Sequence, residues 1–224
     1  MITKSKFFVL SVLFSALCFN LSFSQEEENT SKKEQFEKLL FFDYRGTNAI
    51  EAAIGTSVIN GDLEDPIFEI YFRIGYKHFL SDYVNIGFTY NKYNVAYRDI
   101  YNEGFMSFDL NFEYLMFPYK KFTPFIYAGA GYNAANYFVT SSTKVQGAIG
   151  FESIVSEKVG IRLFGEYNSN FSDDLDGLVA GATNDTFFRI GLGVNFYFGG
   201  AERRERRLKN IDTVINSNPI PRDN

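Results

Sequence analysis

Ionisable residues in the middle of this sequence recur at every second position of otherwise apolar segments. In one such segment, Arg73 and Lys77 alternate with Phe72, Ile74 and Tyr76. Residues i, i+2 and i+4 of a β-strand point to the same face. The spacing therefore predicts strands with one charged face and one apolar face. Charges that are removed from water must be paired and hydrogen-bonded, so the chemistry to expect first is ion pairing.

The same alternation, applied along the chain, predicts which charges face the interior of a barrel. The set comprises Glu51, Glu69, Arg73, Lys77, Asp109, Glu113, Glu152, Arg162, Glu166 and Arg189. Carboxylates outnumber bases in this set, which predicts that some carboxylates are protonated or hydrated. The favoured interpretation is a packed network of ion pairs that stiffens the barrel. The alternative is a narrow, gated path for ions or water.

Catalytic and cofactor chemistry finds little support in the residue types. His78 is the only histidine, and its place beside a short connection at residues 80–83 predicts a structural role at the periplasmic rim. No cluster has the spacing of zinc ligands, and no Ser/His/Asp arrangement can be recovered. The glycine-rich stretch 128–131 does not follow a strand and open a helix, so it is not a phosphate loop. The prediction is a protein that is not an enzyme and uses no cofactor.

Two further charge clusters are weaker candidates. Asp173, Asp174 and Asp176 precede Gly177 and could bind Ca²⁺ or bridge to lipopolysaccharide phosphates, but the full calcium-loop spacing is absent, which favours a solvated acidic loop.

A basic cluster follows near the C-terminus. It comprises Arg203, Arg204, Arg206 and Arg207. Charge blocks are usually disordered, so a flexible solvated tail is the favoured interpretation. The alternative is a docking strip for a periplasmic partner or for anionic lipid headgroups.

The elements that must position these side chains are eight apolar alternating segments separated by Gly, Pro, Asn and Asp. They span residues 48–60, 67–79, 84–93, 105–117, 123–133, 144–155, 159–168 and 187–198. Each is close to the roughly 9–11 residues that a tilted strand needs to cross a bilayer. The 26 Phe and 15 Tyr, with no Trp, also favour strands. A sheet in lipid must close, and eight strands leave an interior that side chains fill.

The connections predict how such a barrel is oriented. Short connections at 80–83, 118–122 and 156–158 alternate with longer ones at 94–104, 134–143 and 169–186. Outer-membrane barrels have short periplasmic turns and long outer loops. The prediction is an all-β protein, an eight-stranded antiparallel up-and-down transmembrane β-barrel at residues 45–200, with both termini periplasmic.

The two ends of the chain complete the predicted organisation. Lys4 and Lys6 precede an apolar run that ends in small residues, which is typical of a cleavable signal peptide at 1–24. Cys18 lies inside that segment, so the mature chain would have no thiol. Residues 25–44 are read as a short periplasmic lead, either a helical turn or disordered, and 201–224 as an Arg-rich periplasmic tail. A formal net charge of -5 and the lack of a basic stripe exclude nucleic acid as a partner.

Several stretches also carry a resemblance to a known family. They are Asn48–Glu51, Gly55–Asp62, Phe68–Phe72, Asn102–Leu110, Lys121–Phe125 and Ser172–Gly177. The chain from about Tyr44 to Gly200 resembles the small outer-membrane β-barrel module found with curli-type secretion and assembly proteins of Gram-negative bacteria. Its general architecture is similar to the OmpA/OmpX-like class. No CsgG-like α/β domain is seen, so the resemblance implies a role in fibre export or surface assembly but not the export pore.

These inferences combine into one functional hypothesis with two alternatives. The favoured hypothesis is a barrel with a side-chain-filled lumen that acts in surface architecture, adhesion or curli-like fibre assembly through its outer loops and its tail. Its partners would be outer-membrane lipid, lipopolysaccharide and curli-type secretion components. The first alternative is a narrow channel for ions or small solutes. The second is a soluble periplasmic barrel with an apolar interior that binds an apolar ligand.

Overall fold

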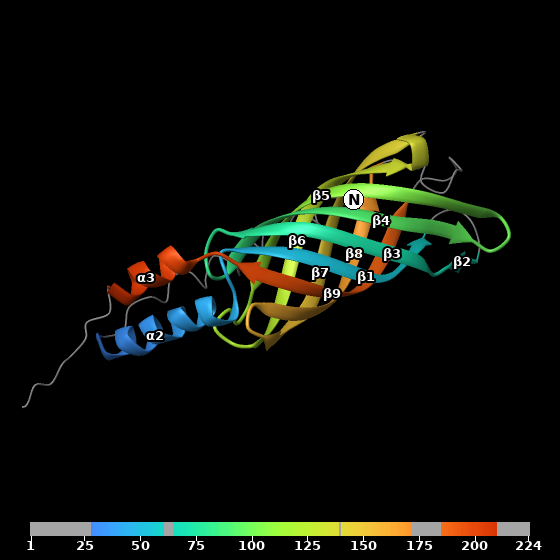
Figure 1. Cartoon of the computed structure of the whole chain (residues 1–224). Helices are drawn as coiled ribbons and strands as arrows, with labels where there is room; N and C mark the ends of the chain where they lie inside the picture. Colours follow the sequence, from blue (N-terminus) through green and yellow to red (C-terminus); the bar gives the residue numbers. More distant parts are fainter. Residues whose placement is uncertain (1–27, 61–64, 139, 172–184, 210–224) are drawn as a thin grey trace, which may run out of the picture. The chain divides into compact units, whose positions relative to one another are not determined.

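The computed structural model of the chain describes residues 28–60, 65–138, 140–171 and 185–209 (Figure 1). Residues Phe36–Asn224 form one compact unit, which contains the whole barrel. The elements are α2 (Glu28–Tyr44), β1 (Asn48–Asn60), β2 (Pro66–Ile67), β3 (Glu69–Phe79), β4 (Val84–Tyr97), β5 (Tyr101–Leu115), β6 (Phe122–Ala135), the 3₁₀ turn η1 (Asn136–Phe138), β7 (Ser141–Ser156), β8 (Val159–Asn170), β9 (Thr186–Phe198) and α3 (Ala201–Lys209).

The strands form one closed antiparallel sheet. Each pairs with its neighbours in the order β2-β4-β3-β1-β9-β8-β7-β6-β5, and the additional pairing of β4 with β5 closes the ring. β2 and β3 both pair with β4 and are separated only by Phe68, so they count as one strand of the barrel. The described residues thus form a barrel of eight strands, which confirms the predicted fold. Closure leaves no long sheet edge without a partner.

Side chains alternate between the two faces along most of this barrel, and the alternation breaks near the loop end of β4, where Val95, Ala96 and Tyr97 are all buried. In β9, Phe187 and Arg189 are buried in the interior, whereas Phe188 and Ile190 are exposed on the outside. The outer face is a belt of exposed aliphatic and aromatic side chains, among them Ile54, Ile74, Phe88, Phe112, Ile149, Leu163 and Leu192. A soluble barrel with an apolar ligand would need the opposite arrangement. That alternative is therefore wrong, because the charges are inside and the apolar surface is outside.

Two predicted loops are partly strand. In place of a loop at 94–104, β4 and β5 stay paired from Asn94↔Gly104 to Tyr97↔Tyr101 and leave a turn of Arg98–Ile100. The Asn and Gly residues there were read as breakers, but Asp99 alone takes up the reversal at φ 57°, which short polar side chains tolerate. Similarly, β6 runs to Ala135 and β7 begins at Ser141, so half of 134–143 is strand.

The links β3–β4, β5–β6 and β7–β8 lie at one end of the barrel, here called the turn end, and the links β1–β2, β4–β5, β6–β7 and β8–β9 lie at the other, the loop end. The β4–β5 link of the loop end, residues 98–100, is as short as those of the turn end. At the turn end the chain also enters the barrel from α2 and leaves it toward α3. The predicted short lead is a helix of 17 residues. Its apolar anchors, Leu39, Phe41 and Phe42, are buried at the end of that lead.

The C-terminal segment also differs from its prediction. Residues 201–209 form helix α3, with Glu202 in its first turn and Arg206, Arg207 and Lys209 in its last. Acidic residues early and basic residues late both favour a helix through its macrodipole. The prediction of a flexible tail is wrong for these residues. Within the described residues, no helix is long and apolar enough to cross a membrane. The predicted signal peptide, the acidic cluster Asp173, Asp174 and Asp176, and residues 210–224 lie outside the described part of the chain.

Candidate functional site

Charged side chains of alternating sign run through the barrel interior as one continuous series, here called the ion-pair ladder. In order from the turn end, it consists of Arg45, Glu152, Arg162, Glu113, Lys77, Glu51, Arg73, Glu166, Arg189, Asp109 and Lys144. Each member lies within 4.0 Å of the next, and no side chain is more than 5% exposed. The ladder therefore occupies the path that an ion would have to take through the barrel.

Strand periodicity explains how these residues meet. Arg73 and Lys77 stand four residues apart on the inner face of β3, as Asp109 and Glu113 do on β5. The Glu113 carboxylate accepts two hydrogen bonds from Arg162, at 3.0 and 2.5 Å, and one from Lys77 at 3.0 Å. Paired, parallel N–H···O bonds of this kind are among the stronger side-chain interactions.

Glu166 is the most heavily coordinated member. Its carboxylate accepts hydrogen bonds from the guanidinium groups of Arg73 and Arg189, from the Tyr127 hydroxyl, and from the Asn168 amide at 2.8 Å. The Arg189 Nε atom lies 2.7 Å from Glu166 Oε1. Buried ion pairs are tolerable only when further hydrogen bonds satisfy the remaining lone pairs and protons, and this carboxylate meets that condition.

The residues predicted for the interior can now be placed. Nine of the ten belong to the ladder, and Glu69 does not. Glu69 is only half-buried at the loop end of β3, and it forms no ion pair with any residue that the structure describes. Sequence reasoning missed Arg45, which precedes the first strand, and Lys144. The signal for Lys144 was its position eight residues before Glu152, on the same strand face.

These two additions reverse the predicted charge balance. The ladder contains six bases and five carboxylates, so the expected excess of interior carboxylates is wrong. Every carboxylate of the ladder lies between two bases. Protonated carboxylates are not needed to explain this interior.

The turn end of the ladder is closed by the end of α2, here called the plug (residues 39–46). Arg45 Nε donates to Glu152 at 2.9 Å, and its Nη1 donates to the carbonyls of Pro118 and Lys120 at 2.8 and 3.1 Å. Burial alone would lower the pKa of Arg45, but the charges and hydrogen bonds of Glu152 and Tyr197 together outweigh burial, and the pKa is raised. Phe41 packs edge-to-face against Phe42 and Phe79, each at 5.3 Å between ring centroids.

Lys158, in the β7–β8 turn, holds the plug from the other side. Its ammonium donates to the carbonyls of Phe42 and Arg45, the latter at 2.6 Å. Burial lowers the pKa of this ammonium. The plug is thus tied to β7, to the β5–β6 turn and to the β7–β8 turn.

The loop end of the ladder is closed by aromatic rings. Tyr93 stacks between Phe105 and Phe187, with centroid distances of 5.9 and 5.0 Å, and all three are buried. The Arg189 guanidinium lies 5.2 Å from the Tyr93 ring and the Lys144 ammonium 5.5 Å from the Phe187 ring, both within the range of cation–π attraction. The rings therefore cover the last charges of the ladder.

Helix α3 binds the turn end through its arginines. Arg207 donates to both oxygens of Asp82, at 2.8 and 2.9 Å, and to the Lys38 carbonyl at 3.0 Å. The Tyr119 hydroxyl donates to the same carboxylate at 3.0 Å, and burial together with the Asp82 charge raises the pKa of Tyr119.

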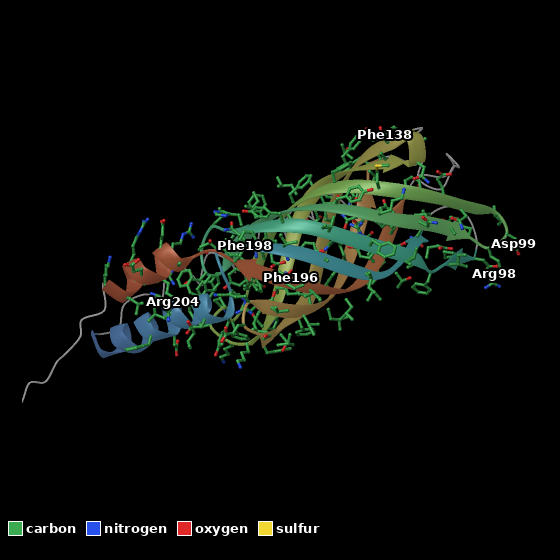
Figure 2. All side chains as sticks on the ribbon, in the orientation of Figure 1. Arg98, Asp99, Phe138, Phe196, Phe198 and Arg204 are labelled. Atoms are coloured by element: carbon green, nitrogen blue, oxygen red, sulfur yellow. The ribbon has the colours of Figure 1, made fainter. Side chains whose placement is uncertain are left out.

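The other arginines of α3 divide into two kinds. Arg203 donates to the Phe79 carbonyl at 3.2 Å, and Arg204, labelled in Figure 2, lies 3.3 Å from Asp43. Among the described residues, Arg206 pairs only with Glu202 of the same helix, at 3.4 Å. Three of the four arginines of the alternative docking strip therefore contact this chain's own turn end. Docking of a periplasmic partner or of lipid headgroups by the four stays a prediction.

The remaining candidates are structural. His78 Nδ1 lies 2.7 Å from the Asn48 side-chain oxygen at the turn end, which is where the sequence placed it. In the part of the chain that the structure describes, no group of three or more His, Cys, Asp or Glu residues could hold a metal ion. The calcium prediction for Asp173, Asp174 and Asp176 concerns residues outside that part.

Inward glycines give large side chains room in this narrow interior, and one of them yields a prediction. A Cβ atom on Gly191 would lie 2.5 Å from Phe164 Cζ, whereas one on the outward Gly147 would meet only the Tyr127 carbonyl at 3.9 Å. We expect Gly191→Ala to lower the free energy of unfolding by about 1–3 kcal/mol through overpacking. Gly147→Ala is the matched control and should change it by less than about 0.5 kcal/mol. Urea unfolding followed by circular dichroism checks both values, and equal losses would show that the Phe164 contact is unimportant.

Comparison with known proteins adds a fold but no function. No family model and no curated protein matches the chain. Among solved structures, neisserial surface protein A is similar with a TM-score of 0.57 and 16% identity over 68% of this chain and 98% of that one. The chain has the fold of a small outer-membrane β-barrel.

Two further matches are more distant. Ail of Yersinia pestis matches with a TM-score of 0.47 and 12% identity, over 69% of this chain and 99% of that one. The N-terminal barrel domain of Pseudomonas aeruginosa OprF matches with 0.45 and 17%, over 69% and 99%. At these identities the likeness concerns the fold alone.

Proposed function

We propose that this chain is a sealed, non-conducting and non-enzymatic barrel of the outer membrane that acts through its loop end in surface contact, adhesion or assembly. The observation that carries the proposal is the ion-pair ladder, closed by the plug at one end and by the Tyr93 stack at the other. A barrel whose interior is filled with paired charges serves as a rigid anchor. Its function then belongs to the parts that leave the membrane.

The outer surface supports placement in a membrane. The apolar belt is bordered at the turn end by exposed aromatic side chains, including Tyr76, Tyr114, Phe122 and Phe198. Aromatic residues are enriched at both interfaces of membrane barrels. Long loops face the cell exterior in such barrels, and the longest connection, β8–β9 at residues 171–185, belongs to the loop end. The turn end, α3 and the end of α2 are therefore assigned to the periplasmic side and the loop end to the cell exterior.

The loop end carries the features expected of a contact surface. The β4–β5 hairpin continues to Tyr97↔Tyr101, past the last β5–β6 pair at Phe105. On its other side β2 accompanies it as far as the pair Pro66↔Tyr97. Large apolar side chains are exposed in the connections of this end, namely Phe68, Ile100, Phe138 and Phe171. Figure 2 shows Arg98, Asp99 and Phe138 at the end of the barrel remote from Arg204. Exposed apolar groups of this kind favour contact with proteins or other surfaces.

The proposed partners are those that an outer-membrane position provides. Lipid surrounds the apolar belt, and lipopolysaccharide surrounds the strands near the loop end. Association with curli-type secretion components stays a prediction from the resemblance, and the exposed apolar hairpin tip is the part of the chain that we assign to it.

Substitution at the loop end tests this function. Ile100→Ser combined with Phe138→Ser should leave the barrel folded and reduce attachment of producing cells, or their display of surface fibres, roughly fivefold, because two exposed apolar contacts of about 1 kcal/mol or less each are lost. Leu208→Ser, an exposed apolar residue of α3, is the control at the opposite end. Unchanged attachment and fibre display in the double variant would refute the proposed surface role.

A further inference from the structure

A pocket of about 280 Å³ lies at the rim of the turn end, outside the ion-pair ladder. Three segments form it: Asp43 and Tyr44 at the end of α2, Lys121 in the β5–β6 turn, and the end of β7 with its turn, including Ser156 and Glu157. The β7–β8 register shifts between Ile154 and Ser156, so Val155 is the extra residue of a bulge. Bulges re-aim side chains and often lie beside binding sites.

The pocket lies where the apolar belt ends. Val155 lines it and is 55% exposed. On the adjoining outer face, Phe122 and Phe151 stack at 5.6 Å between centroids, and both are exposed. If the barrel has the proposed outer-membrane function, this places the pocket at the depth of the headgroups of the periplasmic leaflet, with its open side next to acyl chains.

The charges around the pocket have both signs. The Lys121 ammonium lies 5.8 Å from the centroid of the Tyr44 ring and has no ion-pair partner within the described residues. Asp43 and Glu157 bring carboxylates to the same pocket, and Ser156 brings a hydroxyl. The Asp43 carboxylate is 45% exposed despite its 3.3 Å contact with Arg204. A ligand that fits must offer an anion to Lys121 and Ser156, and a hydrogen-bonding cation to the two carboxylates.

We propose that this pocket binds the phosphoethanolamine headgroup of a zwitterionic phospholipid. The phosphate accepts hydrogen bonds from Lys121 and Ser156, and the primary ammonium donates to Asp43 and Glu157. The acyl chains lie along Val155 and the Phe122–Phe151 pair. A purely anionic headgroup would leave both carboxylates facing like charge, and a quaternary ammonium would offer them no N–H donor.

Native mass spectrometry of the full chain, folded in detergent and mixed with equal amounts of phosphatidylethanolamine, phosphatidylcholine and phosphatidylglycerol, tests the proposal. The folded protein should retain the ethanolamine lipid over the other two. Lys121→Glu should reduce that retention about fivefold, as expected for losing one exposed charge-assisted contact. Lys120→Glu is the matched control: its ammonium lies over the Phe117 ring at 5.0 Å and does not line the pocket.

The outcomes separate this proposal from the proposed function. Equal retention of the glycerol lipid, equal loss in both lysine variants, or no retained lipid would overturn the headgroup site while leaving a folded membrane barrel. Displacement of the lipid by an excess of soluble phosphoethanolamine would assign the pocket to a soluble ligand and would also overturn it. Recovery of the native protein in the soluble fraction of washed cells would instead overturn the membrane placement.

Discussion

Glu166→Ala is expected to lower the free energy of unfolding of the barrel by about 3–5 kcal/mol, the range for removing one partner of a buried ion pair. The carboxylate accepts hydrogen bonds from Arg73 and Arg189, and both guanidinium groups stay buried when it is removed. The penalty arises because each base loses one of its two carboxylate neighbours in the ladder, and not from lost packing. Arg73 keeps Glu51 at 3.7 Å, and Arg189 keeps Asp109 at 3.1 Å. Glu166→Gln keeps the side-chain volume and one of the two acceptor oxygens but not the charge, so its loss should be smaller than that of Glu166→Ala.

Urea unfolding in detergent micelles or vesicles measures this effect, with far-UV circular dichroism as the probe because the chain has no tryptophan. Glu69→Ala is the control: it also removes an inner-face carboxylate, but one that does not belong to the ladder. It should change the free energy of unfolding by less than about 0.5 kcal/mol, as for other substitutions away from special features. Similar losses for Glu69 and Glu166 would contradict the claim that the ladder stabilises the barrel.

Arg45→Ala is expected to have the second large effect, a loss of about 2–4 kcal/mol in the free energy of unfolding, because the buried Glu152 carboxylate loses its nearest base and two carbonyls lose a donor. Glu152 then retains the Tyr197 hydroxyl, the Asn195 amide at 2.9 Å and Arg162 at 3.8 Å, which makes the loss smaller than at Glu166. The carbonyls of Pro118 and Lys120 also lose a donor.

The Arg45 variant has a second expected result, which is local. The plug should open more often, so hydrogen exchange at Phe41–Gly46 should accelerate more than exchange in the strands. Arg206→Ala is the control, since Arg206 is exposed on α3 and pairs only with Glu202. If exchange in the plug is unchanged in the Arg45 variant, the plug is held by its phenylalanines alone.

The outline of the barrel could be predicted from sequence because inside and outside differ in polarity with a period of two. β1 matches its predicted bounds, Asn48–Asn60, and the inner position of Glu113 or Arg162 follows from counting alone. Alternation assigns a face but not a height along the barrel. Which base meets which acid depends on the stagger between strands, so the contact between Arg73 of β3 and Glu166 of β8 across the lumen could not be read from spacing.

The two ends of the barrel were predicted less well, for a different reason. Arg45 belongs to no strand, and it enters the interior only because Leu39, Phe41 and Phe42 pack α2 onto the turn end. Glu69 lies on the inner face of β3, as its spacing predicts, but it is too near the loop end for other side chains to bury it. Arg207 belongs to a block of charges that the sequence predicts to be exposed to solvent. It nevertheless binds Asp82 of the β3–β4 turn, 125 residues earlier in the sequence. Such contacts depend on tertiary geometry and leave no periodic signal.

Conductance of the purified full chain in planar bilayers tests the sealed lumen most directly. The chain should insert without discrete openings at either polarity, because the ion-pair ladder, the plug and the Tyr93 stack together occupy the path through the barrel. Flotation of the same preparation with lipid establishes that the protein has inserted, so that a lack of conductance cannot be due to a lack of inserted protein. Reproducible stepwise openings of the unaltered chain would contradict the account and would favour a narrow, gated channel.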